Sequence, residues 1–222
     1  TFGLLKNLER DMADFAWMWE GPYFVSEWSI NGYWEVPKTA WGAPVEDAGY
    51  KKREELMSRF HEQMPGDDSR FLGSCMFYWG QKQELTATWF NAFTEDGFPN
   101  ELYAGYAQLN TTDTVEYAPA PDVKYMLVER AGGQGNIMLK PDQMYSAEIV
   151  FKSLPDTNLQ THWSLRSEDW YSLDLDTLVP VVHYEHLLNR PGKLRLEFCT
   201  PEHEGPYRLF ANLRYPGSIT TS

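Results

Sequence analysis

One carboxylate is notable for its surroundings. Glu27 lies in the run YFVSEW, residues 23–28, where its neighbours are apolar, aromatic or serine. A Glu in such a setting can act as a nucleophile or as a general acid or base, because burial and neighbouring groups tune its pKa. The alternative is an ordinary surface Glu at the end of an edge strand, where it makes a structural hydrogen bond or ion pair.

The segments after Glu27, and after the next β-prone run at residues 70–79, are rich in aromatic rings. Nine Trp and an aromatic content of 15% suit the stacking of flat rings on the apolar faces of sugars, although large aromatics also fill cores. The candidate substrate-binding residues around Glu27 are Trp28, Trp34, Trp41, Glu46, Trp79, Gln81, Glu84 and Trp89.

The net charge of −13 argues against two classes of partner. Phosphate backbones and anionic membranes both bind basic surfaces, so neither nucleic acid nor a membrane is expected. His183 and His186 have a spacing that suits a metal on a helix, but no third ligand accompanies them. Cys75 and Cys199 lack metal-ligand spacing, and the sequence implies no cofactor.

Four segments must position these residues. The patterns predict helices over residues 3–19 and 48–64 and buried strands over 23–28 and 70–79, each strand followed by a long loop. This order is typical of consecutive units of a β/α barrel, where the carboxyl ends of the strands build the active site. Residues 1–117 are therefore expected to form the last part of such a barrel, and the opening TFGLLKNLERDM suggests a longer polypeptide.

The pattern changes near residues 118–124, APAPDVK, which indicate a linker. Short β-prone runs separated by turns follow at 125–129, 144–152, 160–165, 194–198 and 206–215. Their spacing predicts an antiparallel β-sandwich over residues 118–222. A Cys…Trp…Cys signature is absent, so an antibody-type domain is not implied.

The segments PYFVSEW and FLGSCMFYWG, with NGYWEVPKTAWGAPVED and WGQKQELTATWF, resemble the last two strands and loops of a family 2-like (clan A) glycoside hydrolase barrel. In that family an immunoglobulin-like β-sandwich follows the barrel. The resemblance implies retaining hydrolysis of a β-linked glycan, with Glu27 as nucleophile and Trp79 as the floor of a sugar subsite. It also implies a secreted or periplasmic protein.

The resemblance places the acid/base of this family in an Asn-Glu pair at the end of strand four. Asn100-Glu101 follows the last predicted strand instead, so it does not match that position. We therefore expect the acid/base from a missing N-terminal barrel portion or from a second chain. The alternative is a non-catalytic extracellular protein that serves carbohydrate binding or assembly.

Overall fold

The computed structural model describes residues 2–111, 120–121, 123–152, 158–168, 182–184, 188–190 and 193–221. The chain forms two compact units. Unit 1 comprises Thr1–Val36 and Gly49–Val115, and unit 2 comprises Pro37–Ala48 and Glu116–Ser222. The loop expected after the first strand is thus divided between the two units.

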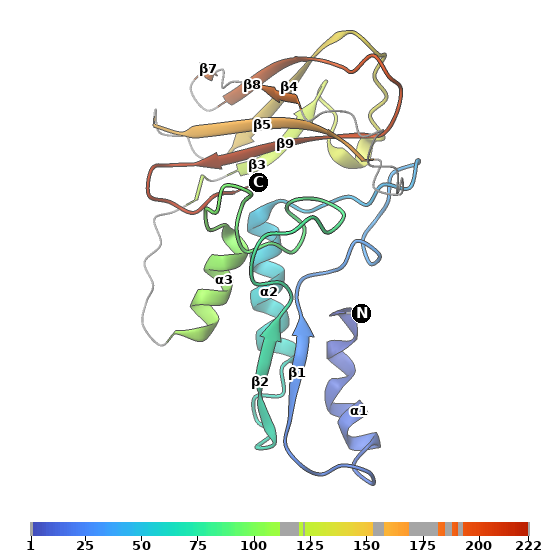
Figure 1. The fold of residues 1–222 in the computed structure, drawn as a ribbon, viewed down its shortest axis with the longest axis vertical. Coiled ribbons are helices and arrows are strands. Elements are labelled where there is room, and N and C mark those ends of the chain that lie inside the picture. Colours follow the sequence, from blue (N-terminus) through green and yellow to red (C-terminus); the bar gives the residue numbers. More distant parts are fainter. Residues whose placement is uncertain are drawn as a thin grey trace. The chain divides into compact units, whose positions relative to one another are not determined.

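Unit 1 is a mixed α and β structure. Its elements are a 3₁₀ helix at Phe2–Asn7, α1 at Leu8–Asp14, β1 at Tyr23–Trp28, α2 at Gly49–Gln63, β2 at Phe71–Met76 and α3 at Glu101–Asn110. The two strands pair in parallel and lie side by side in Figure 1, with α2 as the connection between them. The predictions of two strands and of a helix before the second strand are confirmed, but β2 ends at Met76 rather than at residue 79, so Trp79 lies in the loop after it. The prediction that both strands are buried is wrong for β2, which has no buried residue because the pair packs on helices on one side only.

The first helix is shorter than the predicted span of residues 3–19. A 3₁₀ turn precedes it, it ends at Asp14, and α1 has no buried residue. Leu5 and Leu8 pack against the core of unit 1, whereas Phe15 and Trp19 are about half exposed. Helices in proteins are stabilised chiefly by packing of an apolar face, which explains why this one does not continue.

The core of unit 1 lies between the β1–β2 pair and the helices. Its buried members are Val25, Trp28, Ile30, Leu56, Trp89, Phe90, Leu102 and Tyr106. The indole of Trp28 packs against the rings of Phe60 on α2 and Tyr106 on α3, at centroid distances of 5.6 and 5.9 Å. The aromatic residues of the strand, the helices and the loop after β2 thus share one core.

The pairing of β1 with β2 is irregular at the end that carries Glu27. A register shift lies between Val25 and Trp28, and both of these side chains are buried. Strict alternation would place Val25 and Glu27 on the same face of the sheet. Because the irregularity adds a residue to the interval, Ser26 and Glu27 are both exposed.

Unit 2 contains two antiparallel sheets. The strands are β3 at Val123–Val128, β4 at Met144–Phe151, β5 at Gln160–Ser167, β6 at Val182–Tyr184, β7 at Leu188–Arg190, β8 at Lys193–Cys199 and β9 at Tyr207–Arg214. One sheet has the order β3-β4-β8-β7 and the other has the order β6-β5-β9. A short 3₁₀ helix at Gly133–Gly135 follows β3.

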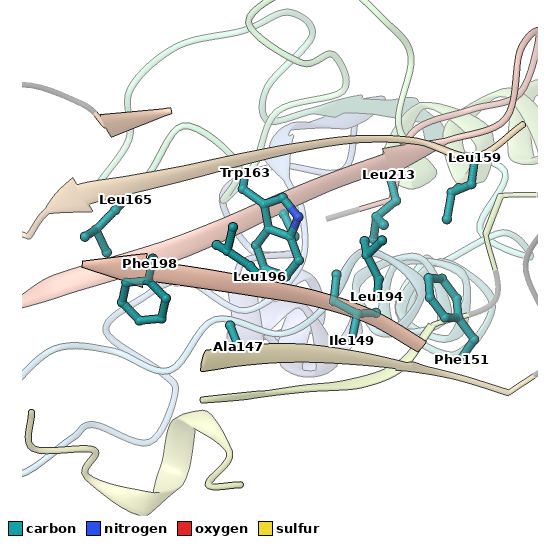
Figure 2. Packing of buried hydrophobic residues seen from close by; sticks show 11 residues of the cluster. Ala147, Ile149, Phe151, Leu159, Trp163, Leu165, Leu194, Leu196, Phe198 and Leu213 are labelled. Carbon is teal, nitrogen blue, oxygen red and sulfur yellow. The ribbon is translucent and has the colours of Figure 1, made fainter. Parts of the chain in front are cut away.

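The two sheets share one apolar core. Its buried residues are Ala147, Ile149, Phe151, Leu159, Trp163, Leu165, Leu194, Leu196, Phe198, Ala211 and Leu213. Figure 2 shows the indole of Trp163, on β5, pointing toward Leu194 and Leu196 on β8. Trp163 is the largest fully buried side chain among the described residues, so its removal would leave the largest void in this core.

The five β-prone runs predicted in the second half of the chain all coincide with strands. The strands β6 and β7, of three residues each, were not predicted, and His183 lies in β6 rather than on a helix. Ala118, Pro119 and Asp122 of the predicted linker lie outside the described residues, as does His186. Val123 and Lys124, also assigned to the linker, are instead the first residues of β3, because the β-prone run pairs with β4 from its first residue. No helix among the described residues has the length and apolarity of a membrane span.

Candidate functional site

Glu27 is the penultimate residue of β1 and its side chain is exposed. The strand end around it is fixed on both sides. The backbone N–H of Phe77, just after β2, donates to the Trp28 carbonyl at 2.7 Å, and the Arg59 guanidinium donates to the Ser29 carbonyl at 2.6 Å. These hydrogen bonds fix the backbone next to Glu27, while the Glu27 carboxylate itself stays exposed.

A polar cluster beneath β1 holds the segment that follows it. The guanidinium of Arg59 is 6% exposed and donates to Asn31 Oδ1 and to Glu55 Oε1, both at 2.7 Å. Glu55 in turn accepts from the backbone N–H of Asn31 at 2.8 Å. The Asn31 carbonyl accepts from the indole N–H of Trp89 at 3.0 Å. The turn after Glu27 is therefore anchored to α2 and to the loop after β2.

The side of the β1–β2 pair away from the core is partly apolar and uncovered within the described residues. Phe24 is 58% exposed and Leu72 is 71% exposed, and Cys75 is also exposed. The buried residues of β1, Val25 and Trp28, face the helices. Glu27 thus belongs to the exposed residues of a parallel pair whose other side is packed.

Two of the predicted sugar-binding tryptophans in unit 1 keep accessible rings. Trp79 is 58% exposed, and its indole packs edge-on against Phe93 at 5.5 Å and tilted against Tyr103 at 5.6 Å. Trp34 is 43% exposed and contacts the ring of Tyr33 at 4.7 Å. In both cases neighbouring rings fix the indole while part of it stays open to a ligand.

Two other predicted sugar-binding tryptophans belong to the core. Trp28 and Trp89 are each 2% exposed, so neither indole offers a free face. The Trp89 N–H is already used by Asn31, and the carbonyl of the preceding Thr88 accepts from the buried Lys52 ammonium at 2.7 Å. The prediction that Trp28 and Trp89 bind sugar is therefore wrong. Both indoles instead support the loops that carry the exposed residues.

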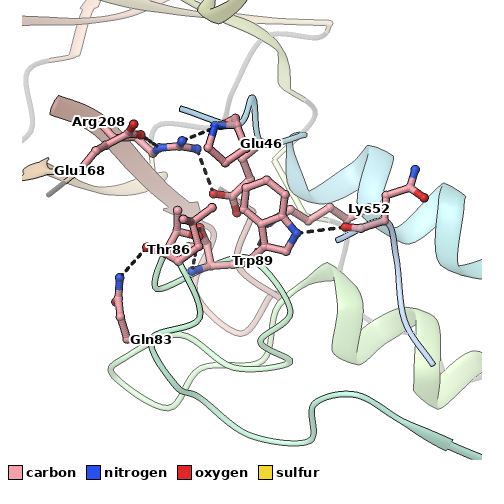
Figure 3. A network of polar contacts seen from close by, with 11 residues as sticks. Glu46, Lys52, Gln83, Thr86, Trp89, Glu168 and Arg208 are labelled. Carbon is pink, nitrogen blue, oxygen red and sulfur yellow. Dashed lines mark hydrogen bonds and ion pairs between the residues drawn. The ribbon is translucent and has the colours of Figure 1, made fainter. Parts of the chain in front are cut away.

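Trp41 and Glu46 belong to unit 2 rather than to the unit of Glu27. Trp41 is 42% exposed, whereas the Glu46 side chain is 9% exposed and pairs with Arg208 at 3.3 Å. Figure 3 shows the Arg208 guanidinium between Glu46 and Glu168, and it also donates to the Pro44 carbonyl at 2.7 Å. Glu46 thus ties residues 37–48 to β9.

The loop after β2 contains Gln81 and Glu84, both partly buried. Glu84 pairs with the ammonium of Lys82 at 2.6 Å, and this ammonium lies 4.4 Å from the centre of the Phe77 ring. The buried Asn91 side chain holds the loop: it accepts from the Lys82 backbone N–H at 3.0 Å and donates to the Lys82 carbonyl at 2.7 Å. The role of Asn91 was not predicted, because no spacing in the sequence marks it.

The pair Asn100-Glu101 has a structural position at the start of α3. The Asn100 side chain accepts from the backbone N–H groups of Leu102 and Tyr103 at 2.9 and 3.2 Å, which is the geometry of a helix N-cap. Glu101 is 5% exposed. This pair does not provide an accessible acid beside Glu27.

The opposite ends of the strands carry a different polar cluster. Asp68 accepts from the Tyr23 hydroxyl at 3.0 Å and from the Arg70 guanidinium at 2.8 Å. The hydrogen bonds from Arg70 lower the pKa of the Asp68 carboxyl to about 2. Inside the core, burial raises the pKa of the Tyr106 phenol. Each shift moves the pKa further from neutral pH, so neither group is a candidate for proton transfer near pH 7.

No group of metal-ligating side chains occurs among the residues that the structure describes. A scan against models of known protein families finds no match, and a search of curated proteins finds none either. The functional interpretation consequently rests on the residues and their geometry.

Proposed function

We propose that this chain is the C-terminal part of a retaining glycoside hydrolase that acts on a β-linked glycan, with Glu27 as its nucleophile. The observation that supports this proposal is the exposure of Glu27 at the carboxyl end of a parallel strand whose opposite side packs on helices. In β/α barrels that strand end carries the catalytic groups. The two parallel strands and the helices of unit 1 are then the last units of a (β/α)₈-type barrel.

A retaining mechanism needs two carboxyl groups about 5–5.5 Å apart. In this proposal Glu27 is the carboxylate that attacks the anomeric carbon, and its side chain is exposed at the strand end. The second carboxyl group protonates the leaving oxygen and then activates water. Since Asn100 caps α3 and Glu101 is buried, we assign that group to the remaining barrel portion or to a second chain.

In this proposal the sugar contacts come from the exposed rings and polar groups of unit 1. Trp79 and Trp34 provide flat apolar surfaces for pyranose rings. Gln81 and Glu84 provide hydroxyl-binding groups in the loop after β2. Unit 2 is proposed to be an accessory domain of immunoglobulin-like type, and the whole protein to be secreted or periplasmic.

The test uses the protein expressed from its complete gene and a panel of 4-nitrophenyl β-glycosides. Glu27→Gln should lower turnover by roughly 10³-fold or more, because the covalent intermediate can no longer form. Azide should restore turnover to Glu27→Ala by replacing the missing nucleophile. Glu20→Gln, which alters an exposed carboxylate seven residues earlier, is the matched control and should leave turnover unchanged.

The alternative proposal is a non-catalytic protein of carbohydrate binding or assembly. The exposed apolar side chains Trp17, Phe24 and Leu72 favour it, since apolar patches on a surface commonly mark interfaces. Failure of the protein to cleave any glycoside of the panel, together with stable oligomers in sedimentation, would support this alternative and contradict the hydrolase proposal.

A further inference from the structure

A groove of about 910 Å³ lies over the β3-β4-β8 sheet of unit 2. Five charged side chains line it: Glu129, Arg130, Glu148, Arg195 and Glu197. Neither the sequence patterns nor the proposed catalytic site accounts for this groove.

The register of the sheet explains why these side chains lie together. Glu148 pairs with Arg195, and Ser146 pairs with Glu197, so the charged residues of β4 and β8 stand side by side. The residues between them, such as Ala147 and Leu196, are buried in the core. Side chains alternate across a strand, and the charged set therefore occupies the outer face of the sheet.

Two of the carboxylates are held by their neighbours. Glu129 Oε1 accepts from the backbone N–H of Ser146 at 2.6 Å and from its hydroxyl at 3.0 Å. These hydrogen bonds, with help from Arg195 and Arg130, lower the pKa of the Glu129 carboxyl. Glu197 lies 3.6 Å from the Arg195 guanidinium, and both side chains are about half exposed. The groove thus presents the Glu129 carboxylate at a place fixed by two hydrogen bonds, beside the Arg195–Glu197 pair.

The turn at the edge of the groove is strained. Glu129 and Arg130 have φ of 47° and 69°, and Val128 and Ala131 exchange two backbone hydrogen bonds of 2.9 Å around them. A two-residue hairpin of this kind prefers Asn-Gly, because both positions need positive φ. Glu129 and Arg130 both carry side chains that disfavour positive φ. Backbone strain of this kind is found often at functional sites.

The presence of both carboxylates and guanidinium groups in the groove favours a neutral ligand over a charged one. Three carboxylates disfavour an anionic ligand, and two guanidinium groups disfavour a polycation. A neutral ligand rich in hydroxyl groups suits both, because carboxylates accept and guanidinium groups donate hydrogen bonds. Met144 also lines the groove, is 63% exposed, and offers an apolar contact for the C–H face of a sugar ring.

We propose that this groove binds a neutral glycan chain at a non-catalytic site on unit 2. Carboxylates and guanidinium groups of β4, β8 and the turn at residues 128–131 hold its hydroxyl groups. The proposal goes beyond the assignment of Glu27 and does not rest on it, since all lining residues belong to unit 2.

Affinity electrophoresis of the 222-residue chain tests this proposal, with laminarin, mixed-linkage β-glucan, xylan, galactomannan and glycogen in the gel. At least one of them should retard the protein. Arg195→Ala and Glu148→Gln should each weaken that retardation about tenfold or more in apparent Kd. Glu204→Gln, in the exposed turn between β8 and β9, is the matched control and should migrate as the unchanged protein does.

Arg130→Gly separates binding from folding. It should weaken retardation while raising the melting temperature, because glycine relieves the positive φ. Retardation by none of the five glycans, or equal retardation of all the groove variants, would overturn the proposal. Polygalacturonate or polylysine as the only retarding polymer would do the same. Glu27→Gln should not alter retardation, so this result is independent of the catalytic assignment.

Discussion

The two units differ in how the faces of their sheets are buried. In unit 2 the inner faces of two antiparallel sheets meet in one core, and the charged residues of β4 and β8 lie on the outside. In unit 1 a parallel pair is packed on one side only, and Phe24 and Leu72 remain exposed on the other within the described residues.

The difference lies in which faces of each sheet are covered. Parallel sheets are normally covered on both faces, whereas a pair of antiparallel sheets covers itself. Within the described residues, unit 2 covers the inner faces of both its sheets, whereas the β1–β2 pair of unit 1 keeps one apolar side exposed. The proposed barrel accounts for this asymmetry, since further strands would enclose the exposed side chains around Glu27.

The largest expected effect tests the core of unit 2. Trp163→Ala should lower the free energy of unfolding by about 3–5 kcal/mol, because it removes a fully buried indole from between the sheets. Urea titration followed by circular dichroism measures it. Trp17→Ala is the control: this indole is 83% exposed and its removal should change stability by less than about 0.5 kcal/mol. Similar effects of the two substitutions would contradict the described core.

A second substitution tests whether unit 1 has an equally specific interior. Arg59→Met should cost about 2–3 kcal/mol, because it removes the buried guanidinium that donates to Glu55 and to the Ser29 carbonyl. The same titration measures it. Arg10→Met is the matched control, since Arg10 pairs with Asp11 on the surface and such pairs contribute little. Equal stability of both variants would show that the cluster beneath β1 does not hold this unit together.

A third substitution should stabilise unit 2. Arg130→Gly places glycine at a φ of 69° and should raise the free energy of unfolding by about 0.5–1 kcal/mol. Differential scanning calorimetry measures the shift. Lys152→Gly, at an exposed position just after β4, is a control that should not stabilise the protein. A loss of stability in Arg130→Gly would contradict the strained turn.

The smallest expected effect concerns pH and unit 1. The pKa of Asp68 is about 2 in the folded protein and near 3.8 when unperturbed, so folding favours the ionised form. Its contribution is present above pH 4 and is lost as the pH falls toward 2. The urea midpoint should therefore fall less steeply over this range in Asp68→Asn than in the unchanged protein. Parallel pH profiles would show that the contacts with Tyr23 and Arg70 do not couple to folding.

The strands were the most predictable part of the fold. Residues 23–28 form a run of apolar and aromatic residues after Gly21-Pro22, and β1 has the same bounds. The runs of unit 2 are separated by strong turn signals, which explains their success. The short strands β6 and β7 escaped prediction, because three residues carry too little pattern to recognise.

The candidate site was less predictable than the strands. Tryptophan is both large and amphipathic, so sequence alone does not separate the buried Trp28 and Trp89 from the exposed Trp34 and Trp79. The exposure of Glu27 depends on a register shift that alternation does not reveal. Glu46 lies close to Glu27 in sequence but binds Arg208 on β9, a contact between residues far apart in the chain.

The most direct test of the central claim is covalent trapping of the nucleophile. The protein from the complete gene is incubated with 2,4-dinitrophenyl 2-deoxy-2-fluoro-β-glycosides, digested and analysed by tandem mass spectrometry. The proposal predicts a fluorosugar ester on Glu27 in the peptide that contains YFVSEW. A label on another carboxylate, or inactivation by none of these reagents, would contradict the assignment of Glu27 as the nucleophile.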